Sequence, residues 1–188
     1  MPKITESKIL ILATDGFEKS ELFVPLEKLK AAGADVVVAA PEKRAIKSWD
    51  QKDWGETIDA DLAVADVDVS DYNAIVLPGG QINPDLLRVD TDAMAIVKTF
   101  LKSGKVVAAI CHAPWLLAEA GVLKGRDVTS YHSIRTDIVN AGGNWQDTEV
   151  VADEGIVTSR SPKDLDAFVS KIIEEVEEGR HEQRDLAA

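Results

Sequence analysis

Short apolar segments alternate along the chain with longer segments in which apolar residues recur every three or four positions. Four of the short segments are apolar at consecutive positions and rich in β-branched residues: 8–14 (KILILAT), 34–40 (ADVVVAA), 73–80 (NAIVLPGG) and 105–110 (KVVAAI). Such runs are typical of strands that are buried on both faces of a parallel sheet. The pattern therefore predicts at least four strands of one such sheet.

The longer segments predict helices. Residues 21–33 (ELFVPLEKLKAAG) and 90–104 (DTDAMAIVKTFLKSG) are amphipathic and each ends in glycine, which favours the end of a helix. Residues 161–179 predict a last helix with Ser161 as its N-cap. Residues 41–71 have no helical period and predict short antiparallel strands or a loop appended to the sheet. The alternation predicts an α/β fold, a three-layer sandwich with helices on both faces of a mostly parallel sheet.

The size of the chain indicates one domain, residues 1–188, which is long enough to bury a good core. The hydrophobic share of 45% and the charged share of 29% are normal for a globular protein. From about residue 180 the chain is polar, and we expect this tail to be frayed.

Charge and segment lengths exclude several classes of partner. The net charge is −12 and no stripe of lysine or arginine is visible, so nucleic acid is not an expected partner. No apolar run approaches the roughly 20 residues that cross a bilayer, and the first ten residues do not resemble an export signal. A single cysteine cannot form an internal disulfide. We therefore expect a cytoplasmic protein without a membrane partner.

Three distinctive motifs directly follow predicted strands: DGFEKSE at 15–21, PGGQINPD at 78–85 and CHAP at 111–114. In an open α/β sheet, ligands bind in the crevice outside the carboxyl ends of the strands. If the sheet is parallel, these motifs meet at one edge. The spacing therefore predicts that they form a single site.

Cys111 lies where a strand is expected to turn sharply into a helix. The small neighbours Ala109 and Ala113 allow such a turn, which exposes a nucleophile at the start of the helix. The helix end lowers the pKa of a cysteine by only about one unit from ~8.5, so a thiolate at neutral pH needs a second contributor. The alternative is that Cys111 is a small, inert core residue, as free cysteines often are.

The stretch AICHAPWLLAEAGVLKGR, together with DGFEKSEL and VLPGG, resembles the ThiJ/PfpI family, and within it the PfpI-type branch of intracellular protease I-like proteins. The resemblance covers nearly the whole chain. It implies a flavodoxin-like fold of the class I glutamine amidotransferase-like superfamily, with Cys111 as the reactive nucleophile. It also implies peptidase, glyoxalase or deglycase activity and a role in stress protection.

The resemblance assigns roles to two neighbours of the cysteine. His112 matches the catalytic histidine of the family, although it could instead contribute only its backbone N–H. Glu18 matches the family glutamate that contacts the sulfur, where a protonated carboxyl could donate a hydrogen bond. The residues alone do not choose between Glu18, Asp15 and Glu21, and the alternative for Glu18 is a solvated loop acid.

Further residues carry weaker expectations. Gly79 and Gly80 allow the backbone to approach a ligand, and the resemblance implies that the amide after Gly79 and the amide of His112 form an oxyanion hole; the alternative is a plain β-turn. Asp85 falls where the family carries an acid that orients the histidine of a neighbouring subunit, but here the loop is one residue longer and ends in Asp instead of Glu. His132 is a candidate pocket residue or a surface histidine.

Two function classes follow. The first is a thiol enzyme, a homo-oligomer (dimer or hexamer) that acts on small carbonyl compounds or on peptides and glycated protein, with small carbonyls favoured as the better electrophiles. The second is a redox sensor or chaperone-like stress protein acting through oxidation of Cys111. A glutamine amidotransferase is disfavoured because TSRSP, near the C-terminal strand, holds no histidine.

We expect no cofactor or metal. The chain has one cysteine and three scattered histidines, His181 in the tail among them, and these residues show no ligand spacing.

Overall fold

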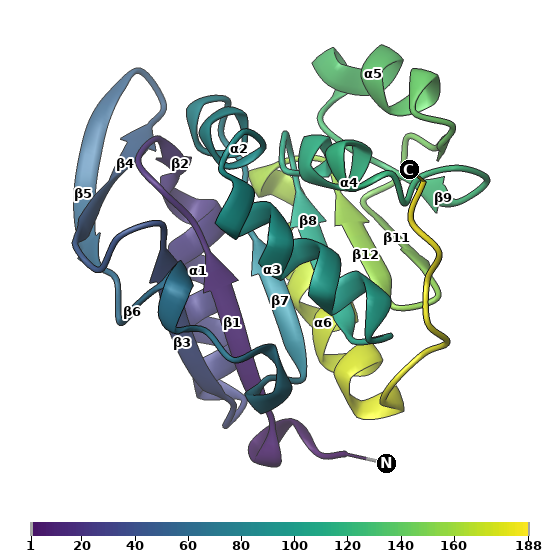
Figure 1. Ribbon diagram of the computed structural model, residues 1–188. Helices are drawn as coiled ribbons and strands as arrows, with labels where there is room; N and C mark the ends of the chain where they lie inside the picture. Colours follow the sequence, from purple (N-terminus) through teal and green to yellow (C-terminus); the bar gives the residue numbers. More distant parts are fainter. Residues whose placement is uncertain (1, 188) are drawn as a thin grey trace.

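A central seven-stranded sheet organises the molecule, and the computed structural model describes residues 2–187 of it (Figure 1). The strand order is β11–β12–β8–β7–β1–β3–β6, and every neighbouring pair is parallel except β11 with β12. The strands are β1 (Lys8–Leu12), β3 (Asp35–Ala40), β6 (Leu62–Ala63), β7 (Ala74–Leu77), β8 (Val106–Ile110), β11 (Val150–Asp153) and β12 (Ile156–Ser159). The four predicted strands are β1, β3, β7 and β8, in the middle of this sheet.

Helices cover both faces of the sheet (Figure 1). One face carries α1 (Lys19–Ala31) and α6 (Leu165–Glu178), while the other carries α2 (Ile82–Leu87), α3 (Thr91–Lys102) and α4 (Pro114–Ala120), with α5 (Arg135–Asn140) packed on α4. Because side chains alternate along a strand, Ile9 and Ile11 enter the core beneath α1 and α6 while Leu10 and Leu12 enter the opposite one. Each inner strand therefore has to be apolar at every position, and the predicted three-layer α/β sandwich is confirmed.

The expected antiparallel strands form within residues 41–71, and a short strand from outside this segment joins them. Strands β4 (Ala45–Asp50) and β5 (Asp53–Asp59) are an antiparallel hairpin, and β4 also pairs with the short β2 (Phe17–Glu18). These three strands make a separate small sheet, in which Trp49 and Trp54 pack edge to face with ring centroids 5.5 Å apart. A further parallel pair joins β9 (Asp127–Val128) to β10 (Asn144–Trp145).

The last helix begins later than its sequence predicts. Ser161 makes no side-chain cap, and a short 3-10 turn, Pro162–Asp164, precedes the start of α6 at Leu165. The guanidinium of Arg160 binds both carboxylate oxygens of Asp164, at 2.9 and 3.0 Å. This bidentate ion pair, instead of a serine cap, fixes the entry to the helix.

The tail after α6 is not frayed, contrary to the expectation from its polar sequence. Arg184 is 3% exposed, and its guanidinium donates to the carbonyl oxygens of Lys105 at 2.8 Å and of Glu154 at 3.1 Å. Backbone hydrogen bonds also join His181 to Gly104 and Ala187 to Gly121. Although it has no helix or strand, the tail lies along the body because its arginine satisfies buried carbonyl groups.

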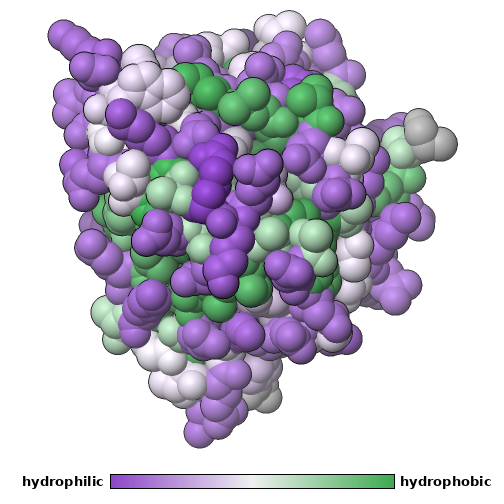
Figure 2. All heavy atoms as spheres, turned by 60° about the vertical axis from the view of Figure 1, so that its left-hand side comes forward, coloured by the Kyte–Doolittle hydropathy of each residue, from purple (hydrophilic) through white to green (hydrophobic). Residues whose placement is uncertain are grey.

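The surface and the helices show no membrane segment. Among residues 2–187, no helix has both the length and the apolar composition that a bilayer span requires. On the face shown in Figure 2, hydrophilic residues surround smaller hydrophobic patches. This distribution agrees with a chain that carries 33 acidic and 21 basic residues.

The register of the sheet brings the three sequence motifs together. Leu77 of β7 pairs with Ala109 of β8, and Val76 pairs with Ile11 of β1, so these strands end at nearly the same level. The segments that follow them therefore leave the sheet side by side at its carboxyl edge.

Candidate active site

Cys111 occupies a strained turn between β8 and α4. Its φ of 65° lies in the left-handed region, which is uncommon for any residue except glycine. The strain is held by two backbone hydrogen bonds, from Cys111 N–H to the carbonyl of Ser159 at 3.0 Å and from Tyr131 N–H to the carbonyl of Cys111 at 2.7 Å. The geometry is the sharp strand-to-helix turn that the sequence predicts, but Cys111 is only 6% exposed.

The Gly79–Gly80 turn packs directly against the cysteine. A Cβ atom on Gly79 would lie 2.6 Å from the Cβ of Cys111, and one on Gly80 would lie 2.5 Å from the carbonyl oxygen of Gly16. Gly80 also has a φ of 81°. Gly79 therefore needs to be glycine because its backbone passes close to Cys111. Gly80 needs to be glycine because its backbone passes close to Gly16 and because its φ is positive.

Glu21, and not Glu18, is the acid beside the sulfur. Glu18 is the N-cap of α1, and its Oε2 accepts hydrogen bonds from the Ser20 hydroxyl at 2.6 Å and from Glu21 N–H at 2.9 Å. Glu21 is fully buried, faces the Cys111 side chain, and accepts a hydrogen bond from Gly79 N–H at 2.8 Å. The expectation for Glu18 is wrong because its carboxylate is engaged in capping the helix.

The observed start of α1 explains why Glu21 is the buried acid. Its position falls on the buried face of α1, which also carries Leu22, Leu26 and Leu29. A carboxylate on the apolar stripe of a helix is rare unless it has a specific partner. Asp15, the third acid of this stretch, instead binds Arg44 at 2.7 Å.

Burial controls the protonation of Glu21 and Cys111. Burial raises the pKa of Glu21 to about 8, and the charge of Glu18 acts in the same direction, so Glu21 holds its proton at neutral pH. Burial also raises the pKa of the Cys111 thiol, and a charged Glu21 would raise it further, whereas the backbone N–H groups of Gly80 and His112 lower it. A protonated Glu21 does not repel a thiolate and can donate a hydrogen bond to it. A protonated Glu21 is therefore the candidate for the second group, besides the end of the helix, that stabilises a thiolate.

His112 lies with its ring against the sulfur, although neighbours in sequence rarely face each other. Its Nδ1 is 3.1 Å from Cys111 Sγ, and its Nε2 is 3.2 Å from the hydroxyl of Ser133. The imidazole stacks on Tyr131 with ring centroids 4.9 Å apart. Burial, together with the charge of His132, lowers the pKa of His112 to about 4. The imidazole is therefore neutral at neutral pH and can accept a proton.

Three residues that the sequence does not single out position this site. Ser133 and Tyr131 hold the His112 ring through the hydroxyl contact and the stacking. Asn83, which is fully buried, accepts a hydrogen bond from Thr14 N–H at 2.7 Å and donates one to the carbonyl of Pro78 at 2.8 Å. It thus ties the segment after β1 to the glycine turn after β7, and no spacing pattern in the sequence reveals this link.

Two predicted site residues lie away from the sulfur. Asp85 is exposed on α2, and within residues 2–187 no hydrogen bond or ion pair joins it to His112. His132 is exposed, with its ring centroid 4.4 Å from that of Tyr131, and no hydrogen bond within residues 2–187 joins its side chain to Cys111 or His112. A role for Asp85 therefore requires a second chain.

The fold and the site together define a class: α/β proteins with a cysteine at the carboxyl edge of a parallel sheet, where a buried acid and a histidine flank the sulfur. Comparison with known proteins narrows this class, because the model of the DJ-1/PfpI family matches residues 7–175. The chain therefore belongs to the DJ-1/PfpI family.

Three relatives illustrate the similarity. The chain is 45% identical to Deglycase TK1284 of Thermococcus kodakarensis over 166 residues, which are 88% of this chain and 97% of the relative. It is 41% identical to General stress protein 18 of Bacillus subtilis over 162 residues, covering 86% and 92%. The crystal structure of Drosophila melanogaster DJ-1beta superposes with a TM-score of 0.81 at 31% identity, covering 95% of each chain.

The first prediction from this geometry concerns the reactivity of the thiol. Replacing Glu21 by leucine removes the hydrogen-bond donor to the thiolate, so we expect alkylation of Cys111 by iodoacetamide at neutral pH to slow by about tenfold, one unit of pKa. Glu27→Leu is the matched control, because it makes the same change at an exposed position of α1, and it should leave the alkylation rate unchanged. Faster alkylation of Glu21→Leu than of the wild type would show that Glu21 is charged and not a donor.

A second prediction follows from the raised pKa of Glu21. Between its ordinary value of 4.5 and about 8, the folded protein holds a proton that the unfolded chain releases. The contribution of Glu21 to the free energy of unfolding is therefore complete at low pH and lost as the pH rises through about 8. We expect the difference in unfolding free energy, wild type minus Glu21→Gln, to fall from about pH 5 to about pH 8 in urea denaturation. A flat difference would contradict a protonated Glu21.

Proposed function

We propose that this protein is a cysteine-dependent stress-protection enzyme that acts on small reactive carbonyls, either free glyoxals or their adducts on glycated thiols and amines. Membership of the DJ-1/PfpI family, with relatives named as a deglycase and a general stress protein, supports this class of activity. The observation that carries the choice of substrate is that Cys111 is only 6% exposed. A small aldehyde can reach such a sulfur more easily than a peptide bond held in an extended chain.

The reaction would begin with addition of the thiol to the carbonyl group. The sulfur forms a bond to the carbonyl carbon, and the electron pair of the C=O bond moves onto oxygen. The proton of the thiol passes to His112, whose Nδ1 is 3.1 Å from the sulfur, and then to the new alkoxide. The product is a thiohemiacetal, or the corresponding adduct of a glycated substrate.

Backbone amides would stabilise the negative charge on oxygen. The N–H groups of Gly80 and His112 both face the sulfur. An oxyanion formed at a carbon bonded to that sulfur lies within their reach, which is the arrangement of an oxyanion hole. Gly79 takes no part as a donor, because its N–H is already bound to Glu21 at 2.8 Å.

The second candidate function is redox sensing through the same cysteine. It is supported by the two backbone N–H groups and the carboxyl group of Glu21 around the sulfur, which could hold the oxygens of a sulfinic acid. Cys111 is the sole cysteine of the chain, so no internal disulfide could record the oxidation.

Turnover measurements separate the two functions. With methylglyoxal, glycated thiols and peptides as substrates, we expect the wild type to consume one of the carbonyl substrates and Cys111→Ser to consume none, since every route passes through the sulfur. Serine is nearly isosteric, so circular dichroism should show a native fold in the variant. Turnover that survives in Cys111→Ser would contradict the enzymatic proposal, whereas no turnover combined with sulfinic acid at Cys111 after peroxide treatment would favour the sensor.

We further propose that Asp85 completes the site from a neighbouring subunit. Asp85 is exposed on α2, beside the exposed apolar side chains of Leu86 and Val89, which are 47% and 78% accessible in the single chain. An apolar surface of this kind next to an acid suits contact with a second copy of the chain. The carboxylate would then stabilise the imidazolium of the partner as base-orienting groups do in catalytic triads.

Complementation tests the shared site. We expect Cys111→Ser and Asp85→Ala to be inactive alone and to regain part of the activity when their subunits are mixed, because hybrid oligomers contain one intact site. Hybrid assembly is verified by native mass spectrometry. Full activity of Asp85→Ala alone would show that the hydroxyl of Ser133 is a sufficient partner for His112 and that Asp85 is a surface residue.

A further inference from the structure

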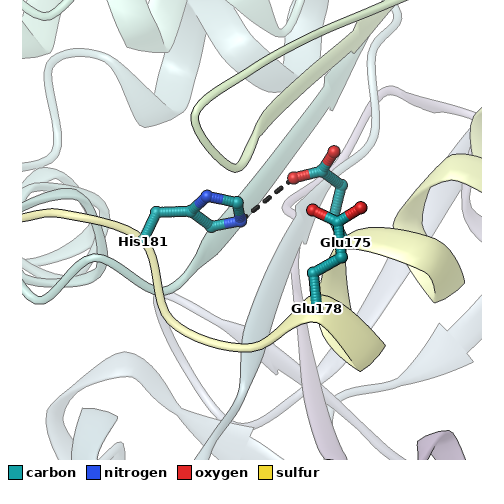
Figure 3. A group of neighbouring side chains, drawn as sticks. All are labelled: Glu175, Glu178 and His181. Atoms are coloured by element: carbon teal, nitrogen blue, oxygen red, sulfur yellow. Dashed lines mark ion pairs between the residues drawn. The ribbon is translucent and has the colours of Figure 1, made fainter. Parts of the chain in front are cut away.

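The end of α6 and the start of the tail bring three metal-binding side chains together, far from Cys111. Glu175 and Glu178 are three positions apart and so lie on the same side of the helix. Gly179, with a φ of 103°, ends the helix, and the chain turns so that His181 faces back toward it. Figure 3 shows the imidazole directed at the two carboxylates. The ligand atoms of all three residues lie within 4.8 Å of one another.

Two polar groups of this cluster, the carboxylate of Glu175 and Nε2 of His181, are buried, whereas the carboxylate of Glu178 is exposed. Glu175 is 7% exposed, and none of residues 2–187 donates a hydrogen bond to its carboxylate. Nε2 of His181 lies 3.0 Å from Oε2 of Glu175, which is an ion pair when the imidazole is protonated, but the contact lacks hydrogen-bond geometry (Figure 3). That ring nitrogen is itself buried and has no hydrogen-bond partner within the described part of the chain. A buried carboxylate and an unsatisfied imidazole nitrogen are costly unless something binds both.

We propose that Glu175, Glu178 and His181 bind one divalent transition-metal ion, of the kind represented by Zn²⁺. One imidazole and two carboxylates are ligands that zinc and its neighbours in the first transition row accept, whereas the imidazole disfavours calcium and magnesium. The exposed carboxylate of Glu178 can rotate to bring its oxygen to the usual Zn–O distance of about 2.0–2.2 Å. Its exposure also leaves room for water as a fourth ligand.

The charges around the group favour a cation overall. Glu174 precedes Glu175 on the helix, and the whole chain has a net charge of −12. The opposing charges include Lys171, which is paired with Glu174 at 2.7 Å, and Arg184, whose guanidinium is bound to backbone carbonyls. Arg180, between Glu178 and His181 in the chain, is a third cation, and its residue is exposed to solvent, which screens its charge.

The site would fasten the tail to the body of the protein. The match to the family model ends at residue 175, so Glu178 and His181 lie beyond it, in a part of the chain that the family model does not describe. A metal that links α6 to His181 would hold the segment leading to Arg184. The spacing Glu-x-x-Glu-x-x-His is visible in the sequence, although the cysteine and the histidines by themselves show no metal-ligand spacing.

Zinc titration of the metal-free protein tests this site. The titration uses full-length Cys111→Ser, so that the thiol beside His112 cannot compete for the ion. We expect isothermal calorimetry to give one Zn²⁺ per chain, with the affinity lowered at least about tenfold by Glu178→Gln and further by His181→Ala. Zinc should also raise the melting temperature of the parent protein, and His181→Ala should abolish that rise.

Glu182→Gln is the matched control, because it removes one exposed acid from the same tail without touching the group. It should bind Zn²⁺ like its parent. Two results would overturn the proposal: no binding by the parent at micromolar Zn²⁺, or equal affinities in the parent, Glu178→Gln and His181→Ala. Circular dichroism of each variant in the absence of zinc shows whether the fold is retained, and Glu178→Gln, at an exposed position, keeps the test valid if His181→Ala does not fold.

Discussion

The buried carboxyl group of Glu21 is the point at which the three strand-end segments meet. It comes from α1, accepts a hydrogen bond from the backbone of Gly79 after β7, and faces Cys111 after β8. The space between them is filled: a Cβ on Gly79 would lie 2.5 Å from Oε2 of Glu21 and 2.6 Å from Cβ of Cys111. Because Glu21 is fully buried, its carboxyl group is removed from bulk water, and its proton stays on at neutral pH.

The same exclusion of water leaves the resting site with little charge. Glu21 is protonated and His112, with a pKa lowered to about 4, is neutral. Any negative charge that appears on the sulfur or on a bound oxygen then meets the N–H groups of Gly80 and His112 and the protonated carboxyl group of Glu21. Such groups are more effective in a site that excludes water than at a surface. The strained backbone of Cys111 is what places the sulfur among them.

The sequence predicts the architecture better than it predicts the site. Strands buried on both faces leave an unmistakable apolar pattern, and the convergence of three motifs follows from parallel strands alone. The sequence does not predict which acid lies beside the sulfur. Glu18 and Glu21 are three positions apart, and only the residue at which α1 begins decides which of them caps the helix and which is buried. Ser133 and Asn83 are polar residues in loops, and their partners are set by the folded structure. The polar sequence of the tail wrongly predicts a frayed end for the same reason. Its polar residues bind backbone carbonyl groups, and no sequence pattern shows which carbonyl groups these are.

The tail and Cys111 lie at opposite ends of β8. Arg184 binds the carbonyl of Lys105, just before β8, and His181 binds that of Gly104, whereas Cys111 follows the last residue of β8. The five residues of β8 separate these ends by roughly 16 Å, at ~3.3 Å per residue. The part of the chain beyond the family match thus reinforces the amino edge of the sheet. A tail held by a metal ion would therefore change the stability of the protein without entering the chemistry of Cys111, and the two sites can be tested separately.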